Sequence, residues 1–235
     1  MQMAEGGSIQ PPRRTQAERR AETREQILDA AEYLFSQNGL HGVAMRDVAQ
    51  RAGVHTSLLH YYFADKRGLF EAVFARRADV SIERRMAALE QYEAEAGDAP
   101  TVEGALHAFL DTDLDLYIEG GAPWMNWGAF GARVSNTPEG AELLDIYFDR
   151  VVLKLVSILK RALPELSEKD IFWGYHFVTG ALLHTLGRSG RIDRLSGGLC
   201  RSDEFGEIKE RMADFLAAGF LALKARPRSS ILNSA

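Results

Sequence analysis

The stretch MRDVAQRAGVHTSLLHYYF, which spans Met45–Phe63, predicts two short helices joined by a tight turn. From Met45 onward, apolar side chains recur at positions i, i+3 and i+4, which places them on one helical face. Gly53 suits the left-handed conformation that commonly ends a helix, and Thr56–Tyr62 then forms a second helix. The outward side chains of this second helix are donors and acceptors with few charges. The pattern is typical of a helix-turn-helix whose second helix contacts base edges in a DNA groove.

The sequence around this motif resembles a known family. Three segments within residues 27–74, ILDAAEYLFSQNGLHGVAM, RDVAQRAGV and LLHYYFADKRGLFEAVF, resemble the DNA-binding domain of the TetR family of bacterial repressors, and they cover about a fifth of the chain. The resemblance implies an all-α fold, with an N-terminal three-helix helix-turn-helix domain and a C-terminal helical domain for ligand binding and dimerisation. It also implies a ligand-responsive, sequence-specific regulator, which we expect to be a homodimeric repressor.

Eight residues of this region are expected to contact double-stranded operator DNA. In the family, the Lys three residues after the Phe commonly contacts the DNA backbone, and Lys66 occupies that position. Positions 43 and 44 lack the hydroxyl that family members often place there, so Arg46 and backbone amides are expected at phosphate instead. The expected DNA-binding residues are Arg46, Thr56, Ser57, Leu58, His60, Tyr61, Tyr62 and Lys66.

We expect four segments along the chain. They are a disordered basic arm at 1–22, the helix-turn-helix domain at 23–70, a ligand-binding and dimerisation domain at 71–225, and a loose tail at 226–235. The arm carries several arginines diluted by glutamates, so it is either a solvated helix start or an arm that touches phosphates. The sequence TREQ at 23–26 fits a capping box that begins the first helix before Ile27.

The charge distribution is compatible with DNA binding although the whole chain carries a net charge of −5. Residues 1–80 contain 11 Lys and Arg against 10 Asp and Glu, whereas the remainder contains 17 against 23. The N-terminal part is therefore slightly positive and the rest is negative. A dimer would double the cationic contacts with a duplex.

The composition excludes several classes of protein. With 46% apolar residues in 235, the chain can bury a sizeable core. No apolar run approaches the roughly 18 residues of a membrane span, and the N-terminus shows no secretory signal. Cys200 stands alone, so neither a disulfide framework nor a Cys-rich metal site is expected. We expect a cytoplasmic protein without a cofactor and without a membrane partner.

The remaining sequence predicts further helices and no strands. Their expected ranges are 65–74, 83–96, 101–119, 124–134, 137–163, 167–186 and 204–224, with breaks at 97–100 and 120–121 and a loop at 187–200. The helix at 137–163 is apolar on more than one stripe, so we expect it to be buried on several sides.

The middle helices are expected to enclose a cavity for a small, largely apolar ligand with a polar anchor. Aromatic stripes are more often plain core, but the short segment 124–134 carries several bulky rings between two loop signals. The stretch RIDRLSGG at 191–198 resembles that of family members that sense fatty acyl compounds, which implies a fatty-acyl-like ligand. The candidate lining residues are Phe109, Asp113, Tyr117, Trp124, Trp127, Phe130, Tyr147 and Phe177.

The helices at 167–186 and 204–224 show more apolar surface than one core needs, and similar proteins dimerise through two C-terminal helices per subunit. Gly174 and Gly180 permit close helix approach. The alternative is that these faces pack inside the monomer. The candidate interface residues are Ile171, Tyr175, Val178, Leu182, Phe215 and Phe220.

The sequence disfavours a second functional class and leaves a third open. An enzyme is disfavoured because Asp111, Asp113 and Asp115 alternate and do not share a helical face, and no phosphate loop, nucleophile elbow or zinc motif occurs. His176 and His184 are two turns apart, too far to share a metal directly. The third class is a DNA-independent helical protein with a partner-binding or structural role.

Overall fold

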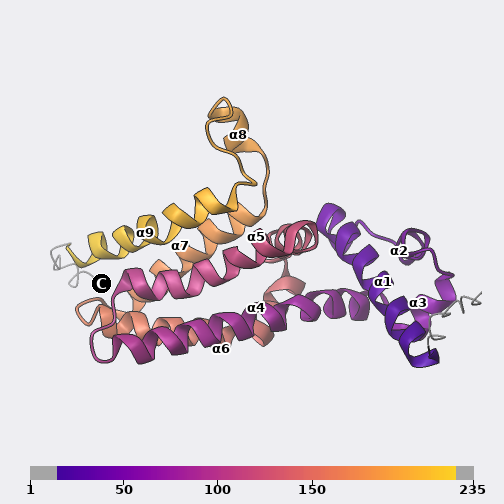
Figure 1. Ribbon diagram of the computed structural model, residues 1–235, viewed down its shortest axis with the longest axis horizontal. Coiled ribbons are helices and arrows are strands. Elements are labelled where there is room, and N and C mark those ends of the chain that lie inside the picture. The colour runs from indigo at the N-terminus through magenta and orange to yellow at the C-terminus, as the bar shows by residue number, and fades with distance from the viewer. Residues whose placement is uncertain (1–14, 226–235) are drawn as a thin grey trace, which may run out of the picture.

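The computed structural model describes residues 15–225. Within that range nine helices follow one another and no strand occurs, which confirms the all-α prediction. They are α1 (Gln16–Asn38), α2 (Met45–Ala52), α3 (Thr56–Tyr62), α4 (Lys66–Ala96), α5 (Val102–Val134), α6 (Pro138–Ala162), α7 (Glu168–Leu186), α8 (Arg191–Leu195) and α9 (Phe205–Lys224). Figure 1 shows α1–α3 as a head at one end of an elongated helical body. The disorder predicted for 1–14 and the loose tail predicted for 226–235 lie outside the described residues.

Helix α1 begins earlier than the sequence predicted. The Thr15 hydroxyl accepts a hydrogen bond from the Glu18 N–H at 3.2 Å, and the Glu18 carboxylate accepts one from the Thr15 N–H at 2.7 Å. This is a complete capping box. The box predicted at Thr23 is wrong, because its hydroxyl donates to the carbonyl of Arg19 instead. Residues 16–22, which we expected to be disordered, are helical.

Helix α4 runs without a break from the head into the body, where two separate helices were predicted. Asp65 caps it by accepting a hydrogen bond from the Gly68 N–H at 2.8 Å. From residue 69 to residue 96 the sequence contains neither Gly nor Pro, so nothing interrupts the hydrogen-bond ladder. The domain boundary predicted at 70/71 falls inside this helix and stays a prediction.

Helix α5 is kinked where the sequence placed a break. Gly121 adopts φ 59° and ψ −145°, a conformation that glycine reaches without strain. Pro123 lacks the N–H that would bond to the preceding turn. The kink divides α5 into a long segment that packs in the body and a short segment, residues 122–134, that leads back toward the head. In the predicted loop at 187–200, α8 forms a projection between α7 and α9 (Figure 1).

Helix α6 has one buried face, which corrects the expectation that it is buried on several sides. Val151, Leu155 and Leu159 are fully buried on that face. Ile146 and Leu153, by contrast, expose 73% and 55% of their area. Its apolar surplus therefore lies at the molecular surface.

A histidine joins α5 to α9. His107 Nδ1 lies 2.9 Å from a carboxylate oxygen of Asp111, and its Nε2 lies 3.0 Å from one of Asp214. Partial burial disfavours the charged ring, but the two carboxylates outweigh it and raise the pKa of His107 above its ordinary value.

Candidate DNA interface and ligand cavity

The head presents α3 on a short, rigid turn. Gly53 adopts the left-handed conformation at φ 68° and ψ 29°, and the Val54 N–H donates to the carbonyl of Ala49 at 3.0 Å. His55 then caps α3 by accepting a hydrogen bond from the Ser57 N–H at 3.4 Å. Leu59 is fully buried and anchors the helix in the head. This is the geometry that the sequence predicted for the helix-turn-helix.

The side chains predicted to contact DNA fall into two groups. Those of Ser57, His60 and Tyr61 are exposed on α3, and that of Arg46 is 85% exposed in the first turn of α2. The other four are partly buried, and they are Thr56, Leu58, Tyr62 and Lys66. The first group is exposed to solvent, whereas the second lies partly within the packing of the head.

An arginine of α1 supports the aromatic pair of α3. The Arg20 guanidinium donates to the Tyr61 hydroxyl and lies 5.3 Å from the centre of its ring. The Tyr62 hydroxyl donates to the carbonyl of Arg20 at 3.1 Å. Sequence reasoning placed Arg20 in a disordered arm and so missed this contact. Tyr61 is therefore held in place, whereas His60 has no fixed partner in the described residues.

Lys66 is fixed by the head itself. Its ammonium donates to the carbonyl of Val43 at 3.2 Å, just before the first turn of α2. Asp47 supports the same turn by accepting a hydrogen bond from the Ala44 N–H at 3.3 Å. The ammonium thus lies close to the start of α2, where backbone N–H groups are unpaired and an anion is favoured.

A cavity of about 480 Å³ lies in the body, enclosed by α4, α5, α6 and α7. Its lining is mainly apolar and aromatic, as is usual for a small-molecule site. The predicted residues Phe109, Asp113, Tyr117 and Trp127 line it.

The other four predicted lining residues lie elsewhere. Phe130 packs between Phe35 and Phe70, with ring centres 6.1 Å and 5.0 Å away. Tyr147 lies against Phe74 outside the cavity wall, and Trp124 lies behind Trp127. The prediction that Phe177 lines the cavity is wrong for a different reason. Its side chain exposes 59% of its area on the outer face of α7.

A buried ion pair crosses the cavity wall. Arg85 of α4 donates to Asp113 of α5 at 2.6 Å, and both side chains are more than nine-tenths buried. Ser81 donates to the same carboxylate at 2.7 Å. Sequence reasoning found Asp113 but missed Arg85. The sequence did indicate that Arg85 is buried, because it lies one turn from both Ser81 and Leu89 on the inner face of α4.

Three donors at this wall have no partner among the described residues. They are Arg85 Nε, the Tyr117 hydroxyl and Trp127 Nε1. Burial first, and then the charge of Asp113, raise the pKa of Tyr117 well above its ordinary value, so the hydroxyl remains a donor. An unpaired buried donor costs about 1–3 kcal/mol. All three atoms are buried within the wall and have almost no accessible surface.

Most of the predicted dimer residues are buried inside the monomer, which corrects the prediction. Ile171, Val178, Leu182 and Phe220 expose 5% of their area or less. Tyr175 lines the cavity. A Cβ on Gly174 would lie 2.2 Å from the ring of Phe220, so this glycine permits close contact of α7 with α9 within one subunit.

Only Phe215 of the six predicted interface residues is exposed, at 79%. It is accompanied by other exposed apolar side chains that the prediction did not include. Trp173 and Phe177 lie on the outer face of α7, and Leu199 lies in the loop after α8. Gly180 has open space around it.

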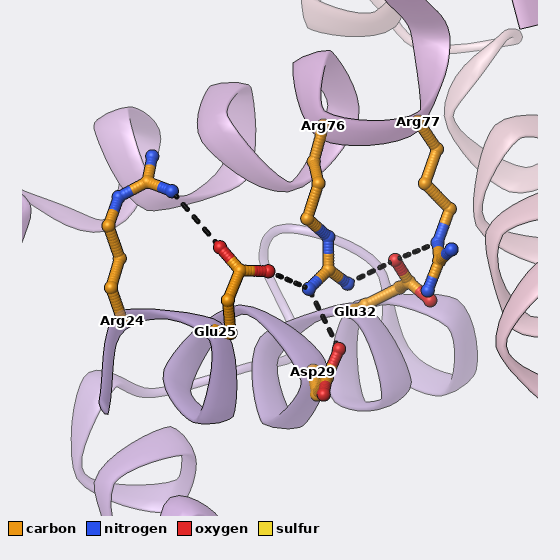
Figure 2. A network of polar contacts seen from close by, with 6 residues as sticks. All are labelled: Arg24, Glu25, Asp29, Glu32, Arg76 and Arg77. Carbon is orange, nitrogen blue, oxygen red and sulfur yellow. Dashed lines mark hydrogen bonds and ion pairs between the residues drawn. The ribbon is translucent and has the colours of Figure 1, made fainter. Parts of the chain in front are cut away.

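A network of charges joins the head to the body. Figure 2 shows Glu25, Asp29 and Glu32 on α1 facing Arg76 and Arg77 on α4. One oxygen of the buried Glu32 accepts hydrogen bonds from Arg76 at 2.6 Å and Arg77 at 2.7 Å. Arg76 also contacts Asp29 at 2.7 Å and Glu25 at 3.2 Å. Burial disfavours the charge on Arg76, but the carboxylates outweigh it and raise the pKa of its guanidinium.

The same network reaches the cavity wall. The guanidinium of Arg77 lies 5.3 Å from the centre of the Trp124 ring. Trp124 in turn contacts Trp127 edge to face, with ring centres 5.7 Å apart. A continuous set of side chains thus connects the cavity with Glu32 of the head.

Two further kinds of site are absent from residues 15–225. No group of three or more His, Cys, Asp and Glu side chains in that range is arranged to hold a metal ion. Within the same range, no helix combines the length and the apolar character that crossing a membrane needs.

Comparison with known proteins agrees with this geometry. Residues 27–73 match the family model for bacterial regulatory proteins of the tetR family, and residues 107–219 match that for the tetracyclin repressor-like, C-terminal domain. The HTH-type transcriptional regulator BetI of Escherichia coli is 31% identical over 152 residues, which are 64% of this chain and 75% of BetI.

Solved structures share the fold. The crystal structure of HlyIIR, a hemolysin II transcriptional regulator, has a TM-score of 0.57 at 20% identity and covers 84% of this chain and 98% of its own. That of FadR from Bacillus subtilis in complex with stearoyl-CoA has a TM-score of 0.51 at 17% identity, with 83% and 98% covered. The chain therefore belongs to the TetR family of DNA-binding transcriptional regulators, which are not enzymes.

Proposed function

We propose that this chain is a homodimeric repressor that acts in the cytoplasm and leaves its operator when a small, largely apolar ligand fills the cavity. A fatty-acyl-like ligand is one form of this proposal, given the stretch at 191–198 and the stearoyl-CoA in the FadR structure. Two surfaces and one interior site carry the function: the exposed face of α3, the outer face of α7 and α9, and the cavity.

The exposed polar face of α3 supports sequence-specific reading. Ser57, His60 and Tyr61 offer hydrogen-bonding groups at the spacing of a recognition helix in the major groove. Arg46 and Lys66 both place positive charge near the start of α2, where it can meet the DNA backbone.

The observation that carries the proposal is the continuity of α4. Phe74, Ser81 and Arg85 of this helix line the cavity. Arg76 and Arg77 of the same helix hold α1 of the head. A change in the position of α4 on ligand binding is therefore transmitted to the reading helix through contacts that are already formed.

The expected consequence is a shift between two populations. Without ligand, the two heads of a dimer are spaced to enter successive major grooves. A ligand that binds better to a second spacing draws the protein toward that spacing and away from the operator. A ligand-bound structure with an unchanged separation of the two recognition helices would contradict this mechanism.

The homodimer is supported by the apolar outer face of α7 and α9. Trp173, Phe177 and Phe215 are exposed there, and Leu199 exposes 88% of its area beside them. A patch of several large apolar side chains is costly on a free monomer. The open space at Gly180 on the same face would let a second α7 approach closely.

DNA binding is tested by electrophoretic shift with the promoter upstream of the chain's own gene and with a random duplex, each at two salt concentrations. The promoter should be preferred. His60→Ala should change the sequence preference because its side chain is exposed and free, whereas His41→Ala, exposed away from α3, should not. Equal binding to both duplexes would refute sequence-specific recognition.

The dimer is tested separately by sedimentation of Phe177→Asp and Phe215→Asp. Both side chains are exposed in the monomer, so the variants should fold yet sediment as single chains. Ile146→Asp, an equally exposed position on α6, should remain dimeric. Dimers of both α7 and α9 variants would show that the interface lies elsewhere.

A further inference from the structure

The mouth of the cavity carries a pair of acidic side chains. Asp145 and Asp149 lie one turn apart on α6 and line the cavity together. Both are exposed, and within residues 15–225 neither has an ion-pair partner. Across the opening, α7 contributes Phe172, Tyr175 and His176.

No lysine or arginine of the described cavity lining is free to balance these carboxylates. Arg85 is the only Lys or Arg among the lining residues of the described chain, and its guanidinium is already paired with Asp113 at 2.6 Å. The lining therefore holds three carboxylates against one guanidinium. The carboxylate of a fatty acid, or the phosphates of a coenzyme A thioester, would meet repulsion at this mouth.

The side chains next to the mouth favour a positively charged group on the ligand. Phe148 of α6 and both Phe172 and Tyr175 of α7 add aromatic rings to the cavity lining. The Arg85 guanidinium lies 5.9 Å from the centre of the Phe148 ring, and the Lys160 ammonium lies 5.9 Å from that of the Phe172 ring. Aromatic faces attract cations, and more strongly where water is excluded. Two carboxylates and several rings are a common environment for an organic ammonium group.

A second feature of the cavity wall is a pair of buried donors without acceptors. The Tyr117 hydroxyl and Trp127 Nε1 are both more than nine-tenths buried and lack an acceptor in the described structure. They line the part of the wall formed by α5, away from the acidic pair on α6. A ligand that reaches them with an oxygen or nitrogen acceptor removes the cost of these unpaired donors.

We infer that the effector is a lipophilic cation, whose apolar body fills the cavity and whose positive group lies at Asp145 and Asp149. This rests on the proposed function, because it assumes that the cavity is the effector site. It also narrows that function, since a fatty-acyl-like body is compatible with the walls but an acidic head group is not.

The inference is tested by isothermal titration of the full chain with three probes that share a decyl chain. They are decyltrimethylammonium, decanol and decanoate, each used below its micelle-forming concentration. The cation should bind about tenfold more tightly than decanoate, with decanol between them. High salt should narrow the difference, because the two aspartates are exposed.

Variants of Asp145 and Asp149 show whether these two side chains cause the preference for the cation over decanoate. Asp145→Asn with Asp149→Asn should bring the affinities for decyltrimethylammonium and decanoate close together. Asp98→Asn, an exposed carboxylate outside the cavity, should leave the preference unchanged. Decanoate binding as tightly as the cation, or a preference that survives the paired Asn variant, would overturn the inference while leaving the cavity as a ligand site. Failure of all three probes to bind would overturn both, although promoter binding would be unaffected.

Discussion

The joint between head and body gives the sharpest test of how this protein works, through the variant Glu32→Gln. Glu32 is 3% exposed and accepts two charge-assisted hydrogen bonds, from Arg76 and Arg77. Each such bond contributes roughly 1.5–3 kcal/mol, and removing one partner of a buried ion pair costs about 3–5 kcal/mol. Arg76 keeps Asp29 and Glu25 as partners. We therefore expect a loss of about 2–3 kcal/mol in the free energy of unfolding, because the glutamine still offers one neutral acceptor.

The assay is urea unfolding at one fixed protein concentration, since a dimer makes stability depend on concentration. The matched control is Glu25→Gln, because Glu25 contacts the same arginine but is 53% exposed. The free energy of unfolding of Glu25→Gln should fall by less than about 1 kcal/mol. Glu32→Gln should also weaken promoter binding, because the head is less firmly held. If the two variants lose the same stability, Glu32 does not hold the joint and the reasoning fails.

Four further outcomes are expected. Tyr117→Phe should leave the unfolding free energy of the ligand-free protein unchanged or raise it by up to about 1 kcal/mol, since it removes an unpaired buried donor. The pKa of His107 is raised in the folded state, so its stabilisation should be present below about pH 6.5 and lost as pH rises through the raised pKa. Urea unfolding should show that the free energy of unfolding falls by under about 1 kcal/mol over this pH range, because the ring is partly exposed. His107→Gln should abolish this pH dependence. Gly174→Ala should cost about 1–3 kcal/mol by overpacking, whereas Gly180→Ala should not lower the stability of the monomer. Lys66→Ala should weaken binding to all duplexes alike in gel shifts and lower the salt slope by about one per subunit.

The start of α1 shows where local sequence signals become ambiguous. Both Thr15 and Thr23 are followed three residues later by Glu or Gln, so each fits a capping box. The choice between them is made by a distant contact, because Arg20 lies between the two and packs on Tyr61 of α3. Sequence periodicity within one helix carries no information about such a partner. The helix-turn-helix itself was predictable, since its turn and apolar face are local.

Helix α7 shows the same limit for a buried face. Ile171 and Val178 lie on one apolar stripe, and Trp173 and Phe177 lie on another. Both stripes have helical spacing, so periodicity cannot decide which one is inside. The decision is made by the close contact of Gly174 with α9, which only the tertiary structure reveals.

The aromatic residues after the kink of α5 were predicted to line the cavity together, and helical geometry explains why they do not. Steps of three residues rotate each side chain by about 60°, so Trp124, Trp127 and Phe130 spread over about 120° of the helix surface. Trp124 therefore faces Arg77, Trp127 faces the cavity, and Phe130 faces the head.

This spread has a mechanical consequence for the proposed function. The segment 122–134 is connected to the rest of α5 only through the kink at Gly121, so it can move as a unit. A ligand that displaces Trp127 must also displace Phe130, because one rigid helical turn carries both. Phe130 packs on Phe35 of α1, and the charge network holds α1 to α4. Two elements that line the cavity, α4 and the segment 122–134, thus both contact the head. The head should therefore move together with them as one body, without a hinge between α1 and α4.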